Sequence, residues 1–577
     1  MGNVLAGAGL FVAVFAAAAA MLWEASPRRS VTMLIALVLI PVLILADQWH
    51  SAEITDLRDH VARFVALGAV AVVAVAVLTA LFRRRPMLLP LAVIAAVPFR
   101  VPIHAGGQEA NLLVPLYLVI AGGVLATAWR QWEEHRGGSS ASATSVTGPA
   151  AGRITLLPKV LAAVLAAVLV LYALQSVYSE DFSRALQNVA FFYVPFALAF
   201  TLLAEWRWDR RLLVLGLGVV AGEALLFVLF GFWEYAARHL IWNPEVIQSN
   251  DFHTYFRVNS LFWDPNIFGR YLALTITAIA AALLWARSPR LVIWLGALVA
   301  VLWLGLITTF SQSSFVALLV GLAALAALRW SARWTLAACA SGAILAVAFV
   351  LAAGGSLKIN LSTEHTLNKD TSGRANLVSE GIALFGDRPL WGYGSGSFSV
   401  AYQKHRTGGN GRLSVSHTEP VTVAAEQGLI GLVAYLALLG VAFATLLSGM
   451  GALMPGLRGP PSAGGVVGEA PLRADSGARS GGSPAATGPA AGRSATSVTG
   501  PAAERVVLVA ARAAVFACFL ALIAHTMAYA GFLEDPLTWV LLSIGGSLAI
   551  APQLAMEQGE ADSQGEWPTA PPAQATA

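Results

Sequence analysis

One histidine is placed where it could act as a general base. His417 comes three residues before Pro420, and a long apolar stretch follows. Proline suits the first turn of a helix, so the sequence predicts that His417 lies just before a membrane helix. An imidazole with an ordinary pKa of about 6.5 accepts a proton from a hydroxyl at neutral pH, although a histidine that only caps a loop turn is the alternative. Glu426 lies about two turns into the helix, where we expect it to orient a loop or to pair with an arginine.

Upstream of this histidine, arginines and glycines form a pattern suited to an anion. An arginine grips phosphate oxygens through two hydrogen bonds, and glycines let backbone amides approach an anion closely. No Gly-Lys-Ser/Thr follows the glycines, so the segment is not a nucleotide-binding P-loop, and a simple tight turn is the alternative. The candidate arginines are Arg257, Arg270, Arg374 and Arg388, and the candidate glycines are Gly392 and Gly394.

The Asp264-Pro-Asn266 triplet predicts the beginning of another helix. Asp264 is a candidate N-terminal cap, with Asn266 as a supporting residue. Arg270 falls in the first turns of that helix, where it either extends to the membrane interface or reaches a phosphate. Asp264, Arg270 and His417 are therefore all expected near the beginnings of helices.

The elements that must position these residues are membrane helices. Hydrophobic residues make up 57% of the chain and charged residues only 12%, whereas a soluble domain has about 25% charged residues. Cys339 and Cys518 both lie in apolar segments and are expected to be core residues. The sequence predicts an all-α polytopic bundle of about 13–15 spans. The expected spans are 4–23, 31–47, 62–82, 87–103, 111–129, 158–178, 186–204, 212–235, 266–286, 291–309, 312–328, 334–352, 421–448, 506–530 and 536–552.

Clusters of arginine in alternate short loops predict the orientation of the bundle. Such clusters belong in the cytoplasm, which places the N-terminus outside and the C-terminus inside. The clusters are Arg28 with Arg29, residues 83–85, Arg207 with residues 210–211, Arg287 with Arg290, and Arg329 with Arg333. The residues with candidate chemistry then face outward.

The same orientation gives a division of the chain into segments. Two linkers rich in Gly, Ser, Ala and Pro share the string SATSVTGPAA and are expected to be flexible and cytoplasmic. The expected segments are helices 1–129, linker 130–157, helices 158–352 with an outer loop 236–265, an extracytoplasmic catalytic loop 353–420, helix 421–448, linker 449–505, helices 506–552 and a cytoplasmic tail 553–577.

The ordered set of motifs resembles the superfamily of O-antigen ligases and O-antigen polymerases, which are bacterial membrane glycosyltransferases. The set begins with an arginine before Asp264-Pro-Asn and a Thr-x-Ser element at Thr309. Next come Gly-Arg at Arg374 and a Pro-x-x-Gly-x-Gly-x-x-x-Phe segment from Pro389, and the set ends with His417 and a Glu-x-Gly-x-x-Gly element. The resemblance covers about residues 250–435. Where the family often has an arginine after Thr-x-Ser, this chain has Gln312.

The resemblance implies a type-C glycosyltransferase fold in the bacterial cytoplasmic membrane, with its site on the outer face. It implies transfer of a glycan from an undecaprenyl diphosphate carrier to a saccharide, lipid or protein acceptor, without a metal or cofactor. His417 matches the proposed base, and Arg257 and Arg374 match arginines that hold the diphosphate. Arg270 or Arg388 could stand in for the arginine that Gln312 replaces.

A transporter or flippase for a glycan-related or other anionic substrate is the alternative function. Transporters often contain internal repeats and broken helices at the midplane of the membrane. No repeat is evident among the helices, and the polar residues gather in outer loops, which favours the enzyme. Nothing in the composition indicates a nucleic acid partner. The sequence does not separate a polymerase from a ligase, because the acceptor pocket has no sequence code.

Overall fold

The computed structural model describes residues 2–49, 55, 60–105, 108–136, 156–243, 246–248, 250, 255–353, 374–407, 416–453 and 501–565. Most of linker 130–157 and of linker 449–505, the part of the catalytic loop at 354–373 and 408–415, and the tail beyond residue 565 lie outside the described residues.

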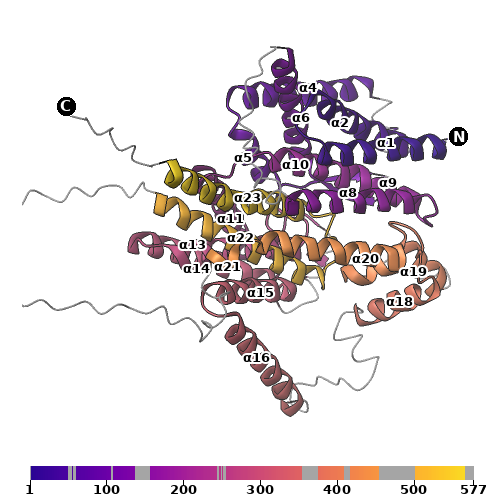
Figure 1. Ribbon diagram of the computed structural model, residues 1–577. Helices are drawn as coiled ribbons and strands as arrows, with labels where there is room; N and C mark the ends of the chain where they lie inside the picture. Colours follow the sequence, from indigo (N-terminus) through magenta and orange to yellow (C-terminus); the bar gives the residue numbers. More distant parts are fainter. Residues whose placement is uncertain are drawn as a thin grey trace, which may run out of the picture.

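The described chain is a bundle of helices, as the composition predicts (Figure 1). Eleven of its helices are long and apolar enough to cross a membrane, and a shorter apolar helix covers Pro536–Ile550. The helices are α1 (Gly2–Leu22), α2 (Pro27–Asp47), α4 (Val61–Arg84), α5 (Leu88–Ala96), α6 (Val114–Arg136), α8 (Leu156–Ser176), α9 (Phe182–Asn188), the π-helix η1 (Val189–Tyr193), α10 (Val194–Ala204), α11 (Arg210–Ala237), α13 (Pro265–Trp285), α14 (Pro289–Thr309), α15 (Gln312–Arg329), α16 (Ala332–Ala353), α18 (Arg374–Asp387), α19 (Phe398–Arg406), α20 (Glu419–Leu447), α21 (Met450–Leu453), α22 (Pro501–Thr526) and α23 (Pro536–Gly565).

The prediction of a membrane span at residues 87–103 is wrong. Helix α5 ends at Ala96, and the chain continues into an antiparallel hairpin of β1 (Val101–Ala105) and β2 (Gln108–Leu112). Pro98 and Pro102 flank Arg100 in this segment, and proline cannot donate the amide hydrogen bond that a helix interior needs. An arginine inside an apolar span is also costly. Both features favour a short helix that ends before Pro98 over a continuous helix through residue 103.

Charged contacts gather several of the predicted cytoplasmic clusters at one end of the bundle. Arg29, at the beginning of α2, forms an ion pair with Glu205, at the end of α10. Glu205 also lies 3.8 Å from Arg130 near the end of α6, while Arg83 at the end of α4 lies 3.3 Å from Glu133 of α6. The termini of helices distant in sequence thus meet at one end, and α18 and α19 lie at the opposite end (Figure 1).

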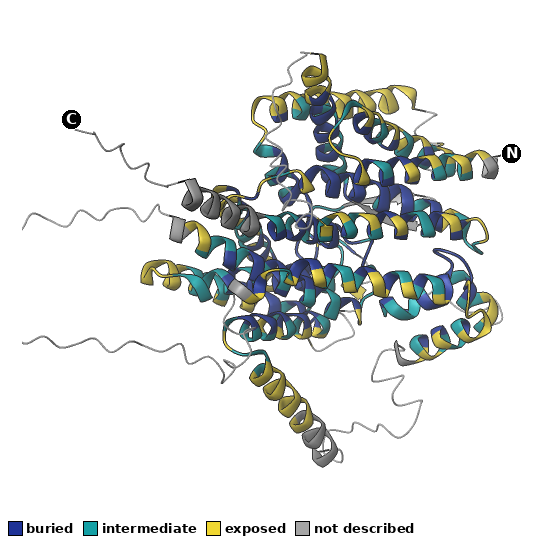
Figure 2. Cartoon of the chain, viewed as in Figure 1, coloured by how far each residue is buried: buried dark blue, intermediate teal, exposed yellow. Residues whose placement is uncertain are grey.

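Exposed apolar side chains mark the surfaces that face lipid. Along α4, Phe82 is the buried residue in a helix that otherwise consists mostly of exposed Val, Ala and Leu. Figure 2 shows α4 and the first part of α16 as largely exposed at the margins of the bundle. The interior helices are different, because α10 is buried over almost its whole length. Such a surface confirms a polytopic membrane protein, since apolar side chains on this scale are not left in water.

Candidate functional site

Helix α20 is broken at Gly428, and the break is held by the loop that follows α18. Gly428 has φ +65°, a backbone conformation that side chains with Cβ rarely adopt. The loop satisfies backbone groups on both sides of the break, because the Gly394 amide donates to the Glu426 carbonyl at 2.7 Å and the Leu429 amide donates to the Pro389 carbonyl at 2.7 Å. The Glu-x-Gly-x-x-Gly element and the glycine-rich loop are therefore two halves of one structural unit.

The Glu426 carboxylate orients the glycine-rich loop from the α20 side. It accepts hydrogen bonds from the amides of Gly396 at 2.8 Å and of Phe398, at the beginning of α19, at 3.0 Å. Gly392 allows the close approach, since a Cβ there would lie 2.3 Å from the Glu426 carbonyl oxygen. The expectation that Glu426 orients the loop is confirmed. Gly392 and Gly394 form part of this tight packing, and both have positive φ.

His417 lies immediately before α20, and Pro420 stands in the first turn of that helix, as the sequence predicts. Its backbone has φ +60°, in the left-handed region that residues other than glycine adopt uncommonly. The next residue fixes the position, because Thr418 Oγ1 donates to the Met527 carbonyl at 3.2 Å. The half-buried His417 is therefore tied to the connection between α22 and α23.

Residues 527–535, called here the α22–α23 connection, run beside the beginning of α20. The Glu419 carboxylate accepts hydrogen bonds from the amides of Gly531 at 2.6 Å and Phe532 at 3.1 Å. At the end of the connection, the Asp535 carboxylate accepts from the Leu537 amide at 2.9 Å and caps α23. The connection is therefore a fixed element between two groups of polar residues.

On one side of the connection, Arg257 is held at the beginning of α13. Its Nε donates to the Thr309 carbonyl at 3.0 Å, and one Nη lies 3.4 Å from Asn266 Oδ1. Ser311 Oγ donates to the same Asn266 oxygen at 2.9 Å. Asp264 caps α13 by accepting from the Asn266 amide at 2.5 Å, which confirms that prediction. The Asp-Pro-Asn and Thr-x-Ser elements therefore meet in space.

Arg270 lies one turn further along α13 and is buried rather than exposed at an interface. Its Nη2 lies 2.6 Å from Asp535 Oδ2, and its guanidinium lies 6.0 Å from the ring of Tyr529. Arg100, between α5 and β1, interacts electrostatically with both Asp535 and Arg270; burial lowers the pKa of Arg100, and Asp535 opposes that effect. We call Arg100, Arg257 and Arg270 the arginine cluster.

A path of hydrogen bonds continues from the arginine cluster to α22. Ser311 Oγ lies 3.3 Å from Ser313 Oγ, which lies 3.2 Å from Nε2 of the buried His525. His525 is near the end of α22, two residues before Met527, which binds Thr418. The path thus joins the beginning of α13 to the segment beside His417.

Of the predicted phosphate-binding arginines, Arg388 lies outside the arginine cluster, and Arg374 is described only in its backbone. The exposed Arg388 lies 3.5 Å from Glu180 and 4.3 Å from the ring of Tyr393. It therefore belongs to the surface around α19. Arg374 is the first residue of α18, and its side chain lies outside the described residues.

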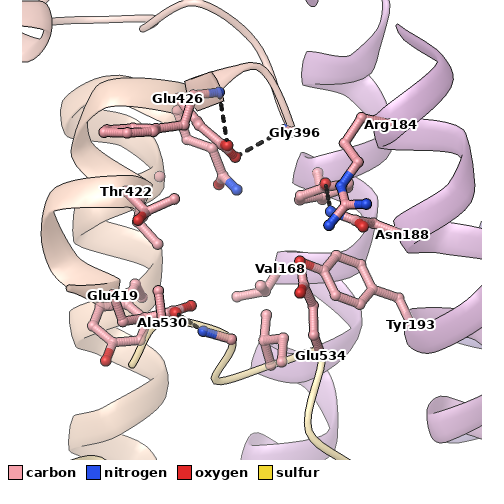
Figure 3. Close-up of a pocket in the computed structure, with 18 of the residues that line it drawn as sticks. Val168, Arg184, Asn188, Tyr193, Gly396, Glu419, Thr422, Glu426, Ala530 and Glu534 are labelled. Atoms are coloured by element: carbon pink, nitrogen blue, oxygen red, sulfur yellow. Dashed lines mark hydrogen bonds between the residues drawn. The ribbon is translucent and has the colours of Figure 1, made fainter. Parts of the chain in front are cut away.

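On the other side of the connection lies a cavity of about 340 Å³. Its walls come from α8, from α9 with η1, from the glycine-rich loop and the beginning of α19, from α20 between Glu419 and Tyr435, and from the α22–α23 connection (Figure 3). Four acidic residues and one arginine line it: Asp181, Arg184, Glu419, Glu426 and Glu534. We call this the acidic cavity. Within the described residues, no cluster of three or more His, Cys, Asp or Glu side chains is arranged to hold a metal ion.

Sequence reasoning missed several of these polar residues. Arg100 falls inside an expected span and was not proposed as a site residue. An arginine between two prolines in an apolar stretch indicates a polar site, because a charge there needs a partner. His525 and Asp535 are likewise ionisable residues at the ends of apolar segments. Arg184 and Glu534 carry no such signal, because only the packing of distant segments brings them to one cavity.

Residues 297–436 match the family model described as O-antigen ligase. The match extends from α14 into α20 and includes His417 and the glycine-rich loop, whereas Arg257 and Arg270 precede it. It confirms the predicted resemblance to the O-antigen ligase superfamily and supports glycan transfer in the assembly of a cell-surface polysaccharide. No curated protein matches the chain.

Proposed function

We propose that this chain, in which residues 297–436 carry an O-antigen ligase domain, transfers a glycan from a lipid diphosphate carrier to an acceptor hydroxyl. The donor is an undecaprenyl-diphosphate-linked glycan, and the acceptor is a saccharide, lipid or protein. The reaction takes place on the outer face of the bacterial cytoplasmic membrane and uses no metal or cofactor.

His417 is the proposed general base. Its imidazole accepts the proton of the acceptor hydroxyl while the hydroxyl oxygen forms a bond to the anomeric carbon of the donor sugar. The bond from that carbon to the diphosphate oxygen breaks, and its electron pair leaves with the lipid diphosphate. The position of His417 before α20 and the bond from Thr418 to Met527 support this role, because they hold the residue at a helix end next to the α22–α23 connection.

The arginine cluster is the proposed diphosphate site. Negative charge develops on the diphosphate as it departs, and cations held in place beforehand stabilise that charge without reorganisation. Arg257 and Arg270 are held by Asn266 and Asp535 respectively, and Arg100 interacts electrostatically with Asp535 and Arg270. This cluster of three arginines is the observation that carries the proposal. In this proposal Arg100 supplies the third cation, in a chain that has Gln312 where the family often has an arginine.

Arg374 remains a proposed phosphate-binding residue, and Arg388 is a weaker candidate because it is engaged with Glu180. Glu426, Gly392 and Gly394 have a positioning role, since they fix the glycine-rich loop against the broken α20. Asp264 and Asn266 act similarly at the beginning of α13.

The outer-face assignment rests on the separation of charge along the bundle. The arginines in the loops after α1, α4 and α10 lie at the end away from α18 and α19. Arginine-rich short loops are retained in the cytoplasm, so the end with His417 and the arginine cluster faces out.

Reconstitution of the full chain with a lipid-diphosphate oligosaccharide tests the proposal. Formation of a longer lipid-linked glycan would identify a polymerase, and transfer to another lipid or to a protein would identify a ligase. Release of the lipid diphosphate should accompany either product. A wild-type chain that neither transfers the glycan nor releases the carrier would refute the proposed function.

A further inference from the structure

The acidic cavity contains buried polar atoms that the described chain leaves unused. Asn188 is 4% exposed, and its Nδ2 donates to the Tyr172 hydroxyl at 2.9 Å while its Oδ1 has no hydrogen-bond partner among the described residues. Tyr435 is also 4% exposed, and its hydroxyl has no partner there either. Buried polar groups are normally satisfied, so two such groups lining one cavity indicate a place for a polar ligand.

One turn of π-helix in the cavity wall positions two of the residues that line the cavity. Between α9 and α10 the chain forms one turn of π-helix, Val189–Tyr193, with Asn188 at its beginning and Tyr193 at its end. Both residues point from this wall toward the cavity in Figure 3. Such single π turns inside α-helices often mark functional sites, because they change which side chains face a neighbour.

Two ionic side chains of the cavity are also without a hydrogen bond or ion pair in the described chain. Glu534 lies on the α22–α23 connection, and Arg184 lies at the exposed beginning of α9. Figure 3 shows the two side chains extending into the same space. Glu419 can accept further hydrogen bonds, because a single carboxylate oxygen accepts both hydrogen bonds from the connection and its other oxygen is not used by them. Most of the available polar atoms are therefore acceptors.

The excess of acceptor atoms in the cavity indicates a ligand that donates hydrogen bonds. A diphosphate offers only acceptors and negative charge, so it is disfavoured beside four carboxylates. A saccharide offers many hydroxyl donors, and the rings of Tyr172, Tyr193 and Phe398 give an apolar surface for its C–H faces. A volume of about 340 Å³ is near the lower limit of small-ligand pockets, which suits the end of a glycan rather than a whole oligosaccharide.

We propose that the acidic cavity is the acceptor subsite, and that it binds the end of an uncharged glycan through its hydroxyls. The inference rests on the proposed function. Glu419, Thr422 and Glu426 line the cavity from the first turns of α20, directly after His417. In this arrangement the glycan end binds beside the helical turns that follow the base in sequence, and the diphosphate binds on the far side of the α22–α23 connection.

Two conservative substitutions test the subsite without removing packing. Tyr435→Phe deletes only the hydroxyl that has no partner, and Glu534→Gln keeps the shape while removing the charge. The full chain is reconstituted with a lipid-diphosphate oligosaccharide donor and neutral or uronic-acid-containing oligosaccharides as acceptors. Each variant should raise the KM for the neutral acceptor about three- to tenfold, the effect of one lost hydrogen bond. Glu534→Gln should also lower the preference for neutral over acidic acceptors.

Donor use separates this inference from the proposed function. The KM for the donor, and the slow release of lipid diphosphate to water without acceptor, should be unchanged in both variants. Tyr271→Phe is the matched control, since its hydroxyl binds Glu223 at 3.0 Å away from the cavity, and it should leave the acceptor KM unchanged. Normal acceptor KM in both cavity variants would overturn the acceptor subsite. Loss of donor use in the wild-type chain would instead overturn the proposed function on which it rests.

Discussion

The two polar regions on either side of the α22–α23 connection have opposite electrostatic character. In the arginine cluster, Arg270 pairs with Asp535, Arg100 interacts electrostatically with both, and Arg257 bonds to Asn266 one turn earlier on α13. The acidic cavity has four carboxylates and one arginine, Arg184. One short segment thus separates a region suited to phosphate from a region suited to hydroxyl donors.

The α22–α23 connection is held by polar contacts from both regions, because it separates them. Glu419 holds it from the cavity side at Gly531, and Arg270 holds it from the other side at Asp535. A displacement of the connection would change both regions at once and would also move Met527, which fixes the backbone after His417. The comparison therefore predicts that substitutions can affect donor and acceptor separately, whereas the histidine between them affects both.

The largest effect is expected for His417→Ala. Without a base to take the proton of the acceptor hydroxyl, transfer should fall about 10²- to 10⁴-fold. Insertion of the protein into membranes should be unchanged, because the side chain lies before α20 and not within it. Product formation by reconstituted protein measures the effect. Near-normal transfer by this variant would remove His417 from the mechanism.

The donor side of the comparison is tested by Arg257→Lys. Lysine keeps the charge but cannot form the paired hydrogen bonds of a guanidinium, so kcat/KM for the lipid-linked donor should fall about 10- to 100-fold. The KM for the acceptor should stay the same. Arg83→Lys, at the opposite end of the bundle, is the matched control. An equal loss for donor and acceptor would contradict the separation of the two regions.

The parts of both regions that stand in short ordered motifs were predictable from sequence. Asp264 as a cap, Pro420 in a first helical turn, and the loop-orienting role of Glu426 all follow from local rules of helix ends and loops. The cavity was not predictable in the same way. Asn188, Tyr435 and Glu534 come from three distant segments, and no local rule relates them.

The acceptor side is tested more broadly by Gly392→Ala. A methyl group there would lie 2.3 Å from the Glu426 carbonyl oxygen, and the positive φ adds strain of about 1–3 kcal/mol. The glycine-rich loop should shift, which raises the KM for the acceptor and lowers the thermal unfolding temperature. Gly386→Ala, near the end of α18 with open space around it, is the control and should be neutral or slightly stabilising. A donor defect without an acceptor defect would show that this loop serves the other region.

The failure at residues 87–103 shows what hydropathy alone does not resolve. The segment is apolar enough to be taken as a span, but α5 contains only Leu88–Ala96 before the hairpin begins. Its arginine contributes to a site built mainly from α13 and the α22–α23 connection. A charge inside an apolar segment is therefore better interpreted as a constraint on packing than as a tolerated exception.

The smallest effect tests whether Arg100 does the work of the arginine that the family often has at the position of Gln312. Arg100→Met should raise the donor KM about tenfold, since one guanidinium is lost while Asp535 keeps Arg270. Gln312 is exposed at the beginning of α15, beside Ser311. Adding Gln312→Arg to Arg100→Met should recover about two- to fivefold of that loss, a modest recovery because the new charge is exposed to solvent. In the otherwise wild-type chain the same change should do almost nothing, because Arg100 already supplies the third cation. If Gln312→Arg improves donor use equally in both backgrounds, Arg100 does not fill that position.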